Sequence, residues 1–132
     1  MTIGEFFGTL QECITAGWRA HLQTSKYSKH MALDEFYKEM PEKVDALIEA
    51  YQADNEVVTG YANLFRADDY NALEMLRALK DLVVKGRKEF CTTTSLESLA
   101  DDVLNLIDST IYKVSKLTES VSLSDYLASE LL

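Results

Sequence analysis

The 132-residue chain has little of what interrupts regular structure, since it contains one proline and five glycines. Proline removes a backbone N–H and glycine weakens regular elements, so their scarcity favours long uninterrupted elements over a loop-rich fold. Hydrophobic residues make up 47% of the chain, which is enough to form a core in a protein of this length. We therefore expect one domain spanning residues 1–132.

Positive charge and long apolar runs are also scarce. Asp and Glu total 22 against 13 Lys and Arg, which gives a net charge of −9. An acidic surface repels the phosphates of DNA. Residues 1–18 contain no Lys or Arg, so the N-terminal segment lacks a basic arm that could bind DNA. No signal-peptide pattern is seen, and no apolar run approaches the roughly 18 residues of a membrane span. These absences predict a cytoplasmic protein with no membrane contact.

Only two cysteines are present, Cys13 and Cys91. They lie far apart in the sequence and do not have the spacing of a metal-binding pair. In a cytosolic protein such thiols are expected to be reduced and buried in the core. A disulfide between them stays open as an alternative.

Apolar residues recur at helical spacing through most of the chain, and no stretch shows sustained alternation of period two. The pattern predicts four helices, over about residues 2–23, 29–58, 69–90 and 95–118. Thr94 and Glu97 have the spacing of a capping box at the start of the fourth helix. Four such amphipathic helices predict an all-α, antiparallel four-helix bundle. Residues 122–132, SLSDYLASELL, predict a short amphipathic helix as a C-terminal tail.

Both histidines, His21 and His30, lie in one short segment that is followed by regularly spaced acids. On one helix, at about 100° per residue, Asp34, Asp45 and Glu49 share a face with His30. Imidazole nitrogen with carboxylate oxygen is a ligand set suited to iron, manganese or zinc. An acidic, solvated helix face has the same spacing by chance, and a histidine at a helix end can simply cap carbonyls. The residues alone leave both interpretations open.

The segment AHLQTSKYSKHMALDEFYKEMPEKVDALIEAY resembles the Dps family, small ferritin-like proteins first known as DNA-binding proteins of starved cells. In that family a histidine near the end of the first helix is followed, after the loop, by a second histidine. An aspartate comes four residues later, another eleven further on, and a glutamate four further still. These intervals match without a gap at His30, Asp34, Asp45 and Glu49. The interval from His21 to His30 is about three residues shorter, within a loop where length is tolerated.

The resemblance implies a ferritin-like bundle that assembles as a homo-oligomer, either a dimer or a larger shell. It implies a ferroxidase site between two subunits, with the histidines of one chain facing acids of the other. His21, Asp45 and Glu49 would hold the tighter metal position, and His30 with Asp34 the second. Such proteins oxidise Fe(II) with peroxide or oxygen and store the ferric product. Iron is therefore the expected metal, with manganese or zinc as alternatives.

Two departures from the family, together with the small size of the chain, favour a second hypothesis, a non-enzymatic bundle that serves as an adaptor or structural subunit. The connector between the second and third helices has little room for the family's short interface helix. Pro41 should kink the second helix between Asp34 and Asp45. The chain also lacks the lysine-rich tail that gives the family its DNA affinity, so DNA binding through such a tail is not expected. A reduced version of this kind would suit a phage or another mobile element.

Two smaller predictions concern side chains outside this segment. Trp18, Phe6 and Phe7 are expected in the core. The third helix concentrates positive charge, which is expected to form salt bridges with the acidic second helix; its basic residues are Arg77, Lys80, Lys85, Arg87 and Lys88.

Overall fold

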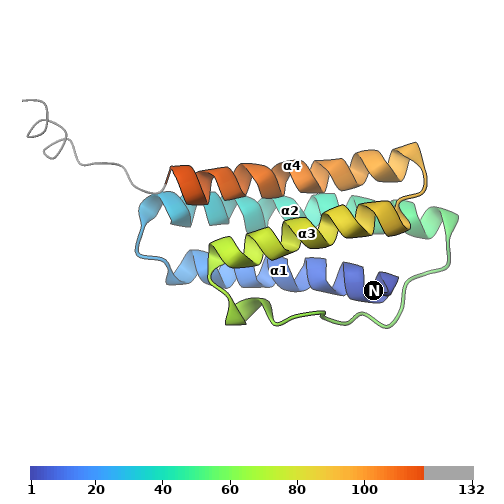
Figure 1. The fold of residues 1–132 in the computed structure, drawn as a ribbon, viewed down its shortest axis with the longest axis horizontal. Coiled ribbons are helices and arrows are strands. Elements are labelled where there is room, and N and C mark those ends of the chain that lie inside the picture. The colour runs from blue at the N-terminus through green and yellow to red at the C-terminus, as the bar shows by residue number, and fades with distance from the viewer. Residues whose placement is uncertain (118–132) are drawn as a thin grey trace, which may run out of the picture.

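The computed structural model describes residues 1–117, which fold into four α-helices and one 3₁₀ turn with no strand among them (Figure 1). The elements are α1 (Ile3–Gln23), α2 (Tyr27–Asp54), η1 (Ala67–Asp69), α3 (Ala72–Phe90) and α4 (Thr94–Lys116). The prediction of an all-α four-helix bundle is confirmed. α2 begins and ends earlier than predicted, and it continues through Pro41. The predicted tail helix, residues 122–132, lies outside the described residues.

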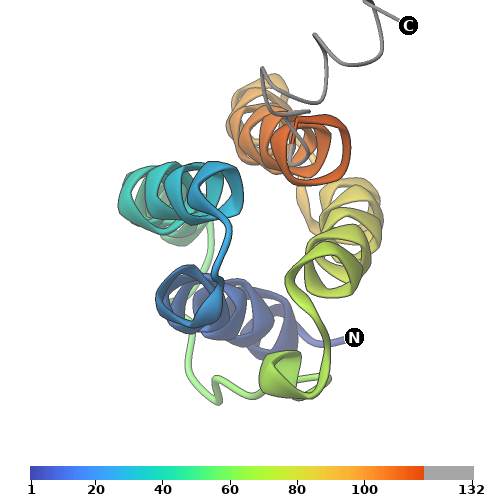
Figure 2. The ribbon, with the colours of Figure 1, turned by 90° about the vertical axis from the view of Figure 1, so that its left-hand side faces the viewer.

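Each helix runs antiparallel to the helices beside it. α1 and α4 both pack against α2 and α3, so the four helices follow the order α1, α2, α4, α3 around the bundle (Figure 2). Short loops join α1 to α2 and α3 to α4. Residues 55–71 instead run the length of the bundle beside α1, so that α3 starts at the end where α2 started (Figure 1). The bundle therefore combines two short loops with one long crossover connection.

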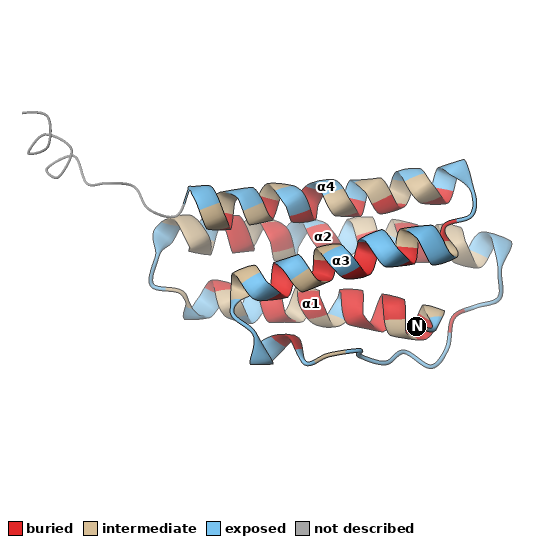
Figure 3. Cartoon of the chain, in the orientation of Figure 1, coloured by how far each residue is buried: buried red, intermediate tan, exposed pale blue. Residues whose placement is uncertain are grey.

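The apolar stripe of each helix faces the centre of the bundle, and the exposed residues lie outside (Figure 3). The largest fully buried side chains are those of Phe6, Phe7, Phe36, Leu10, Leu33, Met40, Leu47, Met75, Leu76, Leu79, Leu96 and Ile107. Burial of this continuous apolar set is the main source of the bundle's stability. The prediction for Phe6 and Phe7 is confirmed, whereas the prediction for Trp18 is wrong. Trp18 is 52% exposed, and its ring stacks on that of Tyr37 instead of entering the core.

Both cysteines are buried and unpaired, as expected for reduced core thiols. Burial raises the pKa of the Cys13 thiol to about 12, and burial is also the main cause of the raised pKa of Cys91. Neither thiol is therefore a ready nucleophile, because the reactive form is the thiolate.

The crossover between α2 and α3 is bound to α1 by backbone and side-chain hydrogen bonds. The N–H of Ala62 donates to the carbonyl of Gly4 at 3.3 Å, and the N–H of Leu64 donates to Thr9 Oγ1 at 3.0 Å. Further along, Arg19 of α1 forms an ion pair with Asp68 of η1. These contacts fix the path of a connector that has no regular structure before η1.

Threonine side chains cap the N-termini of two of the helices. At α1, Thr2 and Glu5 form a capping box, in which each side chain accepts from the backbone N–H of the other, at 3.1 and 2.7 Å. At α4, Thr93 Oγ1 accepts from the N–H of Leu96 at 3.2 Å. The cap predicted at Thr94 is therefore wrong by one residue.

We expect Thr93→Ala to lower the free energy of unfolding by about 1 kcal/mol, because it removes the acceptor for one N–H of the first turn of α4. Thr94→Ala is the matched control, since Thr94 is already helical and caps nothing. Urea denaturation measures both variants. Equal losses in the two would show that Thr93 is not the cap.

Two basic residues of α3, Lys80 and Arg87, form ion pairs with α4 and not, as predicted, with α2. Lys80 Nζ lies 2.8 Å from Asp108, and Arg87 contacts Asp101 at 2.8 Å and Glu97 at 3.4 Å. The hydrogen bond to Asp101 is the main cause of a raised Arg87 pKa. The prediction was wrong because α2 and α3 lie diagonally across the bundle, which cannot be read from charge alone.

Candidate functional site

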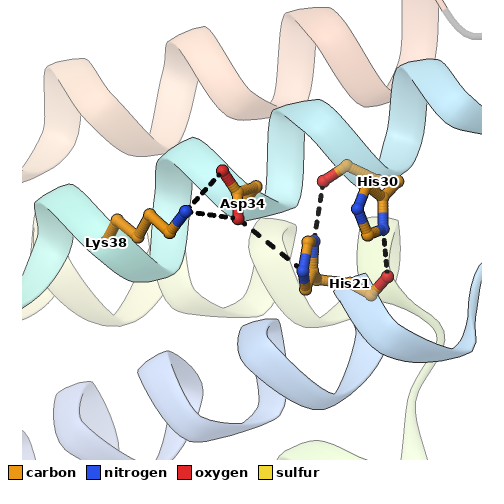
Figure 4. Close-up of polar contacts among 4 residues, drawn as sticks. All are labelled: His21, His30, Asp34 and Lys38. Atoms are coloured by element: carbon orange, nitrogen blue, oxygen red, sulfur yellow. Dashed lines mark hydrogen bonds and ion pairs between the residues drawn. The ribbon is translucent and has the colours of Figure 1, made fainter.

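The two histidines meet where α1 ends and α2 begins (Figure 4). Their rings are stacked, with centroids 3.8 Å apart and planes inclined by 24°. His21 Nδ1 lies 2.9 Å from the carbonyl oxygen of His30, and His30 Nδ1 lies 2.8 Å from the carbonyl oxygen of His21. We call this reciprocal pair the histidine clasp. It joins the last turn of α1 to the first turn of α2.

The clasp determines which nitrogen of each ring carries the proton. A carbonyl oxygen only accepts hydrogen bonds, so Nδ1 of each ring has to be the donor. Nε2 then keeps its lone pair in the neutral imidazole. Histidines that bind metals usually donate their other ring N–H in this way, which orients the ring and raises its basicity. The geometry also suits a capping role, since the carbonyl of His21 belongs to a helix end.

Asp34 is the predicted acid that lies beside the clasp. Its Oδ1 is 3.6 Å from His21 Nε2, and Lys38 Nζ lies 3.0 Å from both carboxylate oxygens (Figure 4). The hydrogen bond from Lys38 is the main cause that holds the pKa of Asp34 below its usual range. The carboxylate therefore stays ionised into acid, directly beside a ring nitrogen that is able to bind a cation.

Asp45 and Glu49 lie elsewhere on α2 and are both exposed. Asp45 shares a face with Asp34, but eleven residues of helix separate them by about 16 Å along the axis. Among residues 1–117, no three His, Cys, Asp or Glu side chains are placed so that they could hold one metal ion. One chain thus brings His21, His30 and Asp34 together and leaves Asp45 and Glu49 apart. Convergence across a subunit contact stays a prediction.

Aromatic rings continue from the clasp to the surface. The ring of Tyr37 lies 5.1 Å from that of His21 and stacks on Trp18 at 5.7 Å. The same end of the bundle exposes several large apolar side chains, namely Trp18, Leu22, Tyr27 and Met31. This surface was not predicted from the sequence, although the four-residue steps from Trp18 to Leu22 and from Tyr27 to Met31 are the spacing of two helical stripes.

None of the helices within residues 1–117 is both long and apolar enough to cross a bilayer. Comparison with known protein families matches residues 21–114 to a family of unknown function, DUF5856. The matched range starts at His21 and includes all five predicted site residues. No curated protein and no solved structure matches the chain.

Proposed function

The chain belongs to DUF5856, a family of unknown function, and we propose that it binds metal as Dps-like proteins do. In this proposal His21, His30 and Asp34 of one copy and Asp45 and Glu49 of a second copy form a site for Fe(II). The bound iron is oxidised by peroxide or oxygen and sequestered. Manganese or zinc are the alternative metals for the same set of ligands.

The histidine clasp is the observation that carries the proposal. It orients two imidazoles, keeps both in the tautomer with a free Nε2 lone pair, and places one of them 3.6 Å from an ionised carboxylate. Nitrogen and oxygen donors in this combination suit first-row transition metals. A single chain offers only part of a coordination sphere, so the proposal requires the second copy.

The charges of α2 bear on such a pairing. The first half of the helix is nearly neutral, because Lys29 and Lys38 lie among Asp34, Glu35 and Glu39, whereas the second half is acidic, with Glu42, Asp45, Glu49 and Asp54 against Lys43. Two α2 helices side by side in opposite directions would place the acidic half of each copy against the nearly neutral half of the other, which keeps the two acidic halves apart. The acids of one copy would then face the clasp of the other.

The residues of this site would act by holding and orienting Fe(II), which is the substrate. Each of two Fe(II) ions loses one electron, and one hydrogen peroxide accepts both electrons with two protons to give two water molecules. Asp34 would exchange its contact with Lys38 for one with the ion, at no cost of deprotonation because the carboxylate is already ionised. Zinc would occupy the same donors without oxidation, since it has no redox chemistry.

A protein-binding role without metal is the second candidate. It is favoured by the exposed apolar side chains around the clasp, because large exposed apolar patches often mark interaction sites. In that case the clasp would only fasten α1 to α2, and the bundle would serve as an adaptor or structural subunit.

His30→Asn separates the two candidates. The asparagine amide replaces Nδ1–H as the donor to the carbonyl of His21, but it offers no equivalent of Nε2. We expect this variant to keep the melting temperature of the parent and to lose metal affinity by more than about tenfold, with Fe(II) oxidation falling as well. Zn²⁺ titration calorimetry and the absorbance of the ferric product measure these quantities.

His30→Gln is the matched control, since it removes the donor near Nδ1 and should lower the melting temperature. A His30→Asn variant that binds and oxidises Fe(II) like the parent would contradict the metal site. If the parent protein bound no divalent metal, the adaptor role would be the remaining candidate.

A further inference from the structure

A groove of about 350 Å³ lies between the first turns of α2 and the last turn of α4. Its apolar lining comes from Met31, Ala32 and Leu117, and the ion pair between Glu35 and Lys113 crosses from α2 to α4 beside it. The exposed fraction is 45% for Met31 and 50% for Leu117. Exposing these side chains to water is unfavourable, so a covering segment would gain stability here.

We propose that the C-terminal segment of the same chain, residues 118–132, docks in this groove. The described structure ends at Leu117, which is itself one of the lining residues. The segment therefore starts at the groove, and the short tether gives it a high effective concentration there. A helix over residues 122–132 would be about 16 Å long, which is enough to cover two turns of α2 after a short reversal.

The sequence of the segment has the pattern that such a groove requires. Leu123, Tyr126, Leu127 and Leu131 fall on one face of a helix. A helix of this length is marginal in water by itself, because nucleation is costly and few hydrogen bonds follow. Packing its apolar face on Met31 and Leu117 supplies the stabilisation that the isolated segment lacks.

Charge favours the start of α2 as the docking surface. Residues 118–132 contain three acids and no Lys or Arg. Lys26 is the N-cap of α2 and Lys29 lies in its first turn, which contains no acid, so the positive dipole end of the helix is not neutralised from within that turn. The two acids that line the groove are each paired with a lysine, Asp34 with Lys38 and Glu35 with Lys113. An acidic amphipathic segment is thus attracted to this end of the bundle. The docking needs no metal, although the groove lies beside the proposed metal site, since Asp34 also lines it.

The methionine methyl groups report on this docking in the full-length chain. Met31 lines the groove, whereas Met40 and Met75 are buried in the core and serve as internal controls. In methyl NMR with a soluble paramagnetic agent, we expect Met31 to be protected in the parent. The variant Leu123→Ser/Leu127→Ser should lose this protection, with no change in the signals of Met40 and Met75. Ser129→Ala, a small change outside the apolar face, should leave Met31 protected.

A Met31 methyl that is equally accessible in the parent and in the double variant would overturn the proposal. Protection that disappears on dilution would also overturn it, because the groove would then be filled by another copy and not by the chain's own segment. Unchanged Met40 and Met75 signals exclude the explanation that the double variant fails to fold.

Discussion

Gly8→Ala is expected to lower the free energy of unfolding by about 1–3 kcal/mol, the usual cost of overpacking. In an exposed helix the same change would stabilise the protein by about 0.5–1 kcal/mol, because alanine is the better helix former. The sign reverses here because a β-carbon on Gly8 would come within 3.0 Å of the backbone N and O of Ala62. Backbone cannot rotate away as a side chain would, so the crossover has to lift off α1. Urea denaturation measures the change.

Gly60→Ala is the control for this prediction. Gly60 has φ of 71°, so alanine costs about 1–2 kcal/mol from the left-handed backbone, but its β-carbon meets nothing within 4 Å. Both variants are therefore destabilised, by different mechanisms. Only Gly8→Ala should speed hydrogen exchange at the N–H of Leu64, which donates to Thr9 when the crossover is in place. A stabilised Gly8→Ala variant would show that the crossover does not rest on α1.

The number of helices could be predicted from the sequence because apolar spacing reports directly on which face each helix buries. The path of the crossover could not. From the sequence, Gly4 and Gly8 only weaken a helix, and the reason for them is visible only in the structure, where the backbone of Thr59 and Gly60 lies against Gly4 and that of Ala62 against Gly8. Gly86 is similar, since the ring of Phe6 occupies the space of its missing side chain. Such glycines reflect contacts between segments that are distant in sequence.

For the candidate site, the sequence predicted which residues share a face of the helix but not how far apart they lie along its axis. Helical periodicity places Asp34 and Asp45 on one face correctly, but a shared face says nothing of the axial separation that keeps them apart in one chain. The clasp was not predicted either, because it depends on backbone carbonyls that no side-chain pattern reveals. The Asp34–Lys38 pair could have been found, since acid and base four residues apart on a helix commonly interact.

Two variants that each fail to bind metal are expected to recover binding when they are mixed. His21→Asn/His30→Asn keeps both distant acids, and Asp45→Asn/Glu49→Gln keeps both histidines. In a two-fold dimer each site takes histidines from one chain and acids from the other, so a mixed dimer contains one complete site of two. Random exchange at equal concentrations makes half the dimers mixed, which gives about one quarter of the parent's metal capacity. Metal content after desalting measures the recovery.

A chain that carries all four substitutions is the control, since it leaves no complete site with either variant. Neither Asp45 nor Glu49 takes part in a hydrogen bond or ion pair within residues 1–117. Replacing these two carboxylates by amides should therefore not destabilise the bundle, and a loss of metal binding can be assigned to the lost ligands. If Asp45→Asn/Glu49→Gln bound metal fully, these acids would not be ligands. If native mass spectrometry showed mixed dimers but capacity stayed at zero, the second copy would not complete the site. Recovery near one quarter is the outcome that only an arrangement across two chains produces.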